Sequence, residues 1–147
     1  MKVERDITID AAPDAVWKVL MDPSRLKEWV SIHAKLKSAP NGILTQGDQL
    51  TQSLRLMRKN FDVEWKVEQA DEPRKAVWEG RGPVRSKAAV VYELRPDGDD
   101  RTRFHYMNEF RAPMGPLGSF FADRAFQRTS EREADKTLDA LKGILEH

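Results

Sequence analysis

Four uncharged polar residues occur in stretches of the chain where apolar residues recur at every second position. They are Gln52, Tyr92, Tyr106 and Asn108. Alternation places each of them on the same strand face as the apolar residues two positions away, and that face is the buried one. A few hydrogen-bonding groups on an aromatic wall are typical of a small-molecule pocket. In such a pocket a tyrosine hydroxyl could donate a proton or polarise a carbonyl group, so Tyr92 and Tyr106 are the candidates for catalysis.

The same polar residues also allow an interpretation without a ligand. Buried amides and hydroxyls often bond to the backbone or to buried water, and then they only order the interior. If the pocket exists, its wall is formed by the inward phase of the strands together with the start of the last helix. The residues expected to bind a ligand there are Gln52, Leu54, Trp65, Trp78, Tyr92, Phe104, Tyr106, Asn108, Phe110 and Phe121.

The remaining titratable side chains do not form a catalytic set. His33 and His105 fall at charged positions of their strands. We therefore expect both to face solvent, where a general base cannot reach a substrate inside the sheet. The carboxylates offer no better catalytic pair. Three lie on the solvent-facing side of a strand, namely Asp62, Glu64 and Glu68, and three lie in a hairpin loop, namely Asp97, Asp99 and Asp100. With three scattered histidines and no cysteine, we expect no metal site and no other cofactor.

The overall charge favours neither nucleic acid nor an anionic membrane as a partner. Lys and Arg number 25 and Asp and Glu number 24, which leaves a net charge of +1. The basic residues Arg124, Arg128, Arg132 and Lys136 recur every four positions but alternate with acidic ones, as on a salt-bridged helix face. Arg5 shares the inward phase of its strand, where it could meet an anionic ligand or extend to the rim.

Neither a signal peptide nor a membrane-spanning segment is predicted. The first six residues lack an apolar core, and no apolar run approaches the length needed to cross a bilayer. We therefore expect a cytoplasmic location and no integral membrane association.

The periodicity of hydrophobic residues predicts the elements that would position these side chains. Residues 61–68 alternate strictly between apolar and charged, as in an antiparallel strand with one wet face. Similar patterns occur at 3–9, 32–36, 50–56, 88–94 and 104–110, and another strand starts at 76–79. Two short helices follow the first strand, one starting at Pro13 and one after Asp22, and a long helix covers about residues 117–146. This order predicts a single α+β domain, residues 1–147, with a curved antiparallel sheet of about seven strands around the long helix.

The long helix carries two apolar sets that differ in phase. Ala134, Leu138, Leu141 and Leu145 lie on one side, whereas most apolar residues between 117 and 126 lie on others. We therefore expect a bend or break between Gln127 and Ala134, or a first half packed against a second surface. Such a first half could be a mobile lid over the pocket, or the bend could be static.

Several segments resemble one known superfamily. They are Ile7–Trp17, Asp22-Pro23, Trp29, Tyr92–Gly98 with Thr102 and Phe104, Glu109-Phe110 and Pro113–Gly118. Together they resemble the START-related SRPBCC superfamily, in its polyketide cyclase/dehydratase-like branch, over about residues 3–146. These segments are helix starts, hairpins and core aromatics, so the resemblance assigns no catalytic residue.

The resemblance implies a helix-grip fold, in which the sheet wraps around the C-terminal helix. It also implies that a hydrophobic small molecule, lipid-, polyketide- or quinone-like, binds between sheet and helix, with or without cyclase- or dehydratase-like chemistry. The alternative is a protein-interaction module that resembles chaperone-ATPase activators, with a filled core and no ligand. A homodimer stays open. Function inferred from a shared fold is analogy, so both possibilities must be tested at the site itself.

Overall fold

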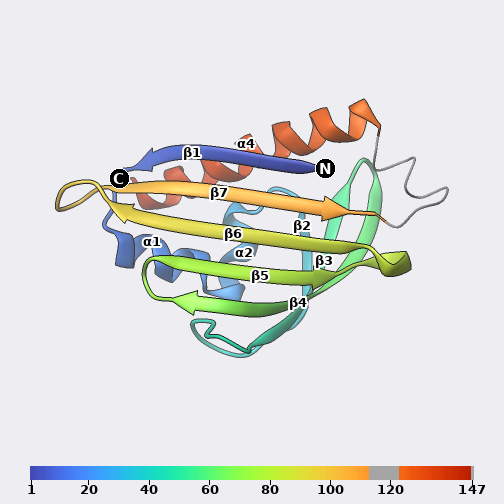
Figure 1. The fold of residues 1–147 in the computed structure, drawn as a ribbon, viewed down its shortest axis with the longest axis horizontal. Helices are drawn as coiled ribbons and strands as arrows, with labels where there is room; N and C mark the ends of the chain where they lie inside the picture. Colours follow the sequence, from blue (N-terminus) through green and yellow to red (C-terminus); the bar gives the residue numbers. More distant parts are fainter. Residues whose placement is uncertain (113–122, 147) are drawn as a thin grey trace.

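The computed structural model describes residues 1–112 and 123–146 and contains one antiparallel sheet with helices on a single face (Figure 1). The sheet has seven strands in the order β1-β7-β6-β5-β4-β3-β2. The strands are β1 (Lys2–Ile9), β2 (His33–Ser38), β3 (Gln49–Leu56), β4 (Lys59–Asp71), β5 (Lys75–Arg81), β6 (Lys87–Pro96) and β7 (Thr102–Arg111). The helices are α1 (Pro13–Leu20), α2 (Leu26–Trp29) and α4 (Arg124–Leu145), with 3-10 turns η1 (Pro23–Arg25) and η2 (Pro83–Arg85). The predicted α+β helix-grip architecture is confirmed.

Local sequence signals set where the helices begin. Pro13 occupies the first turn of α1, where its missing N–H is not needed. The Asp22 carboxylate accepts a hydrogen bond from the Ser24 backbone N–H at 3.0 Å and so caps η1. Asp123 caps α4 in the same way, through the backbone N–H of Ala125 at 2.8 Å. Within the described residues, no helix is both long and apolar enough to cross a membrane.

The α4 helix runs as one element from Arg124 to Leu145, so a break between Gln127 and Ala134 is excluded, whereas a bend there stays a prediction. The other predicted arrangement, a first half packed against a second surface, falls mainly on residues 117–122, outside the described residues. Its buried residues are Phe126, Ser130, Ala134, Thr137, Leu138 and Leu141. At about 100° per residue these six span only about 120° of the helix circumference. The stripe was missed because Ser130 and Thr137 interrupt it with hydroxyl groups. The earlier part of the predicted helix, including Phe121, lies outside the described residues.

Polar contacts tie the second half of α4 to β1 and its following loop. Asp135 accepts a hydrogen bond from the Arg5 guanidinium at 2.8 Å. Lys142 Nζ donates to the backbone carbonyl of Thr8 at 2.9 Å, and Glu146 accepts from the backbone N–H of Asp10 at 2.8 Å. The inward-phase Arg5 therefore contacts the helix rather than an internal ligand.

The strand β2 departs from the alternation that its sequence predicts. Its pairing with β3 shifts register between His33 and Lys35 and again between Leu36 and Ser38. Because each shift changes which residues face inward, His33 and Leu36 are partly buried whereas Ala34 is exposed. The prediction that His33 faces solvent is therefore wrong.

β4 and β5 pack closely around Gly80. Gly80 pairs with Trp65, and a Cβ atom built at Gly80 would lie 2.7 Å from both the Trp65 ring and Val63 Cγ1. Both contacts are with buried, rigid side chains, and real Cβ atoms do not approach so closely. The absence of a side chain at Gly80 thus lets Trp65 lie flat against the strand.

We expect Gly80→Ala to destabilise the protein by roughly 1–3 kcal/mol, because the added methyl group overpacks the core against Trp65. Gly143→Ala is the matched control, since nothing lies within 4 Å of a Cβ atom there and α4 favours alanine. Urea unfolding of both variants checks the prediction. Equal stability of Gly80→Ala and the parent chain would contradict the close packing of Trp65 on Gly80.

Candidate functional site

A cavity of about 80 Å³ lies between the inner face of the sheet and the first half of α4. Its sheet wall consists of Val3, Leu54, Leu56, Phe61, Val63, Trp65, Ala88, Tyr106, Asn108 and Phe110. Its helix wall consists of Phe126, Ser130, Glu133, Ala134 and Thr137. The site thus joins residues more than 70 positions apart in the sequence, and most of its lining side chains are apolar.

The structure divides the ten predicted ligand-binding residues into three groups. Five line the cavity: Leu54, Trp65, Tyr106, Asn108 and Phe110. Four do not line it: Gln52, Trp78, Tyr92 and Phe104. Phe121 lies outside the described residues. All nine described residues follow the predicted inward phase. They fall into two groups because α1 and α2 cover one part of the inner face of the sheet, whereas α4 covers the other.

Tyr92 is at the centre of an aromatic cluster rather than on the cavity wall. Its ring lies 5.8–6.2 Å from four others, those of Trp29, Trp78, Phe104 and Tyr106. Burial raises the pKa of Tyr92 well above its ordinary value, and the neighbouring Tyr106 raises it further. A fully enclosed phenol of this kind cannot reach a molecule in the cavity, so Tyr106 remains the only tyrosine at the site.

The Tyr106 hydroxyl is a neutral hydrogen-bonding group at the cavity wall. Burial raises the pKa of Tyr106, and a hydrogen bond from the side-chain amide of Asn108, 3.3 Å away, opposes that rise. Since Tyr106 accepts this bond, its own proton can be donated to a carbonyl or hydroxyl oxygen. The one carboxylate of the lining, Glu133, pairs with Lys136 at 3.3 Å. The site can therefore polarise a carbonyl more readily than it can abstract a proton.

Two α4 hydroxyls and Ser31 also belong to the polar part of the lining, and none of the three was predicted. Thr137 donates a hydrogen bond to the Ser31 hydroxyl and accepts one from the Ser31 backbone N–H, both at 3.0 Å. Ser130 is 8% exposed, and its hydroxyl has no partner among the described residues. The position of Ser130 and Thr137 within an otherwise apolar helix stripe was the signal that could have identified them.

A chain of side chains supports Trp65 from behind the cavity wall. The indole N–H of Trp65 donates to the Gln52 carbonyl oxygen at 3.0 Å. The amide nitrogen of Gln52 lies 2.8 Å from His33 Nδ1, which must accept this bond and therefore be unprotonated. Desolvation lowers the pKa of His33, and the positive charge of Lys27 lowers it further. Gln52 therefore positions Trp65 and does not contact the cavity itself.

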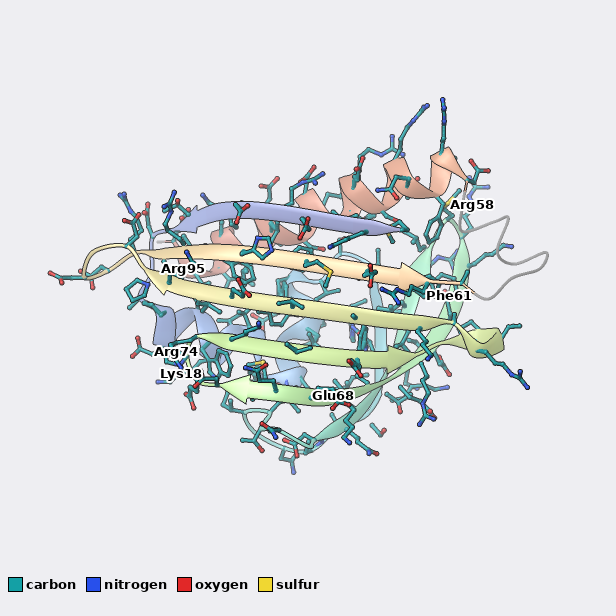
Figure 2. The ribbon with its side chains drawn as sticks, viewed as in Figure 1. Lys18, Arg58, Phe61, Glu68, Arg74 and Arg95 are labelled. Carbon is teal, nitrogen blue, oxygen red and sulfur yellow. The ribbon has the colours of Figure 1, made fainter. Side chains whose placement is uncertain are left out.

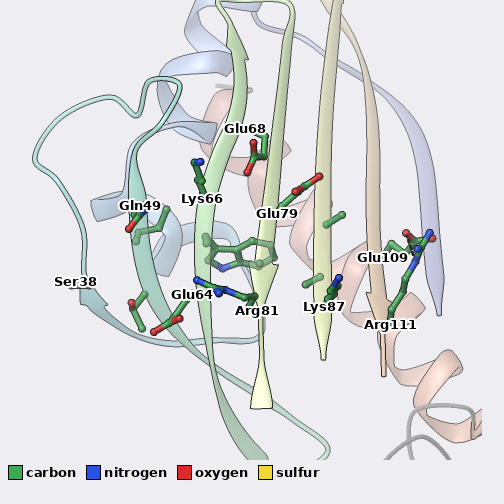
Figure 3. A pocket seen from close by; sticks show the side chains of 16 residues that line it. Ser38, Gln49, Glu64, Lys66, Glu68, Glu79, Arg81, Lys87, Glu109 and Arg111 are labelled. Atoms are coloured by element: carbon green, nitrogen blue, oxygen red, sulfur yellow. Dashed lines mark hydrogen bonds and ion pairs between the residues drawn. The ribbon is translucent and has the colours of Figure 1, made fainter. Parts of the chain in front are cut away.

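A larger hollow of about 840 Å³ lies on the opposite, outer face of the sheet (Figure 3). Its charged lining residues are Glu64, Lys66, Glu68, Glu79, Arg81, Lys87, Glu109 and Arg111. Four acidic and four basic side chains mixed in this way are typical of a solvated sheet face. No group of three His, Asp or Glu side chains suited to a metal ion occurs in the described ranges. The apolar inner cavity is therefore the candidate functional site.

The sequence of residues 1–146 matches a family model described as polyketide cyclase / dehydrase and lipid transport. The chain belongs to this family. That description covers both enzymes and carriers, so membership in the polyketide cyclase / dehydrase and lipid transport family leaves the activity of this member open. The predicted resemblance to the polyketide cyclase-like branch is confirmed.

Similar proteins match the chain over nearly its full length. An uncharacterized protein of Mycobacterium tuberculosis is 28% identical over 137 residues, which are 92% of each chain. A conserved protein from Geobacillus kaustophilus has a TM-score of 0.78 at 18% identity, over 99% of this chain and 95% of that one. The Zhui aromatase/cyclase from Streptomyces sp. R1128 has a TM-score of 0.77 at 18% identity, over 99% and 93%. At such identities these structures show a shared fold and nothing finer.

We expect the His33–Gln52 contact to make the free energy of unfolding depend on pH. A histidine whose pKa is lowered by folding contributes stability that is complete above its unfolded pKa, about 6.5. That contribution is lost as the pH falls from there towards the folded pKa. Urea unfolding at pH 7.5 and 5.5 should therefore show a smaller difference between the two pH values in His33→Ala than in the parent chain. His105→Ala, which leaves the His33–Gln52 contact intact, is the control. An unchanged pH dependence in His33→Ala would contradict the contact.

Proposed function

We propose that the chain binds a hydrophobic small molecule that carries a hydroxyl or carbonyl group, in the cavity between the sheet and α4. The observation that carries this proposal is the Ser130 hydroxyl, which is buried in an apolar wall without a partner among the described residues. A buried hydroxyl without a hydrogen bond costs free energy, so such groups are rare unless something else satisfies them. A bound ligand oxygen would do so.

The arrangement of the cavity supports a ligand with one polar end. Ser130, Thr137, Asn108 and Tyr106 supply the hydrogen-bonding groups, and aromatic and aliphatic side chains form the remainder. A volume of about 80 Å³ accommodates a small part of a ring or chain, whereas pockets for drug-sized ligands measure about 300–1,000 Å³. A larger ligand would displace side chains where the lining is only partly buried, at Phe61 and Phe110.

Binding or carriage is a better match to these residues than turnover. Tyr106 could donate a proton or a hydrogen bond to a ligand carbonyl, which is the contribution that a cyclase- or dehydratase-like reaction would require from it. Such a reaction also requires a base, and the lining carboxylate Glu133 is paired with Lys136. We therefore propose that Tyr106 orients the ligand and that any chemistry is secondary to binding.

Ser130→Ala tests the proposed polar contact. We expect affinity for Nile red, a neutral dye with a carbonyl group, to fall about threefold to tenfold, as loss of one hydrogen bond between neutral groups predicts. The free energy of unfolding should stay within about 0.5–1 kcal/mol of that of the parent chain, or rise, because the hydroxyl has no partner to lose. Dye titration and urea unfolding measure the two quantities.

The control for this experiment is Ser86→Ala, whose hydroxyl is also buried and without a described partner but does not line the cavity. It should leave dye affinity unchanged. Equal affinity in Ser130→Ala and the parent chain would exclude Ser130 as a ligand contact, and absence of any dye uptake would count against the proposed function itself.

Tryptophan fluorescence locates the bound dye. Trp65 lines the cavity. Trp78 does not line the cavity, but its ring packs against the Trp65 ring at a centroid distance of 5.9 Å. We expect Trp65→Phe to remove more of the dye-dependent quenching than Trp78→Phe does. A larger loss in Trp78→Phe would place the dye in the aromatic cluster instead.

A further inference from the structure

Two hairpin tips share an uncommon backbone conformation and a common residue pattern. Within the described ranges, the non-glycine residues with positive φ are Met57, Arg58, Val84 and Arg85, with φ between 52° and 66°. Each tip is thus an apolar residue followed by an arginine, both in the left-handed region. Asn and Gly normally occupy such positions, and a β-branched residue like Val84 is disfavoured there. Backbone strain of this kind is concentrated at functional sites.

Both tips expose their apolar side chain to solvent. Val84 is 61% exposed and Met57 is 37% exposed, and with Ile43 they are the three most exposed large apolar residues of the described structure. Met57-Arg58 joins β3 to β4, and Val84-Arg85 lies in η2 between β5 and β6, so both are at the same end of the molecule (Figure 1). Leu56 and Phe61, which flank the first tip, line the cavity.

Positive charge gathers at this end although the chain as a whole is nearly neutral. Residues 55–60 and 81–87 contain six Lys and Arg and no Asp or Glu. Hairpins at the opposite end, residues 71–75 and 96–101, contain five acidic and three basic residues. Among the described residues, no carboxylate pairs with the tip arginines, although Glu64 faces Arg81 across β4 and β5 on the outer face of the sheet. The hairpin loops at the cavity end are therefore basic, whereas those at the opposite end are mostly acidic.

We propose that the two tips, Met57-Arg58 and Val84-Arg85, dock the protein on an anionic lipid bilayer, with the cavity end towards the lipid. An exposed apolar side chain beside a basic one is the pattern that binds such surfaces, since one enters the interface and the other meets the headgroups. The charge asymmetry orients the molecule before contact. The role of this docking, to load or release a hydrophobic molecule, rests on the proposed function.

A bilayer matches these tips better than an acidic protein does. The apolar residues are single and lie on separate hairpins, so they do not form the continuous patch that a stable protein interface buries. A bilayer interface is deformable and can receive each tip independently. An acidic protein partner is tested directly below.

The first test compares vesicles of neutral phosphatidylcholine with vesicles that contain about one third phosphatidylserine. The parent chain should sediment with the anionic vesicles only, and about 0.5 M NaCl should release most of it, because the Debye length is then only about 4 Å. Arg58→Gln with Arg85→Gln should weaken partitioning about 25-fold, since each cation near an anionic surface contributes about fivefold. Equal binding to neutral vesicles, or no binding to either, would overturn the proposal.

The matched control removes two exposed arginines from the opposite end. Arg95 and Arg103 pair across β6 and β7, and Figure 2 shows Arg95 at the end of the molecule opposite Arg58. Arg95→Gln with Arg103→Gln makes the same change in net charge, and it should alter partitioning less than twofold, because long-range attraction is screened within about 10 Å. If both double variants lost vesicle partitioning equally, net charge alone would explain the loss, and docking by the tips would be contradicted.

A second variant separates docking from folding. Met57→Asn with Arg58→Gly installs the preferred two-residue hairpin loop, so Tm should stay equal or rise. Vesicle partitioning should fall at least about fivefold, as the loss of one arginine predicts. Unchanged partitioning in this well-folded variant would exclude the first tip from docking.

Two further measurements distinguish a bilayer from an acidic protein partner, and docking from binding in the cavity. Retention of the parent chain on immobilised polyglutamate but not on anionic vesicles would replace the bilayer with an acidic protein partner. Nile red uptake without vesicles tests the cavity alone. Dye uptake without vesicle binding would overturn docking and leave the proposed function intact. Vesicle binding without dye uptake would support docking and count against the proposed function.

Discussion

The structure depends on covering one dry face of a curved sheet. Every strand from β3 to β7 presents large apolar side chains inward, and a face of this kind is stable only when other elements exclude water from it. The helices α1 and α2 cover one part and α4 covers the other, and the aromatic cluster around Tyr92 fills the space beneath the first part. The cavity occurs under the first half of α4, away from this cluster. The position of the site therefore follows from how the helices share the sheet.

Alternating hydrophobicity predicted the fold well, because the strands are long and have one wet face. The inward phase of β3, β4, β6 and β7 agrees with the described burial. Prediction failed for β2, where two register shifts turn His33 inward and bring it to Gln52. Register shifts depend on pairing with β3, and nothing in the local sequence of β2 marks them. In α4, counting only apolar residues concealed a stripe that includes Ser130 and Thr137.

The candidate site could be predicted only in part, since an inward phase does not say what lies opposite. Trp78 and Trp65 occupy equivalent positions in the alternation, yet only Trp65 lines the cavity. The difference comes from α1 and α2, whose placement over the sheet is a tertiary property. The net charge of +1 was similarly uninformative, because it conceals basic hairpin loops at one end of the sheet and mostly acidic ones at the other. Only the strand topology shows that residues 55–60 and 81–87 share one end.

The two parts of the interior do not respond independently to sequence change. The main core includes the aromatic cluster, whereas Leu56 and Phe126 form a smaller separate cluster beside the cavity. The two clusters are joined through Met1 and Phe110, which pack against both. Residues with shared contacts act non-additively, so a change at Leu56 or Phe126 is transmitted through these two side chains to the larger core. For protein engineering, a substitution at Leu56 or Phe126 therefore calls for a compensating change at Met1 or Phe110.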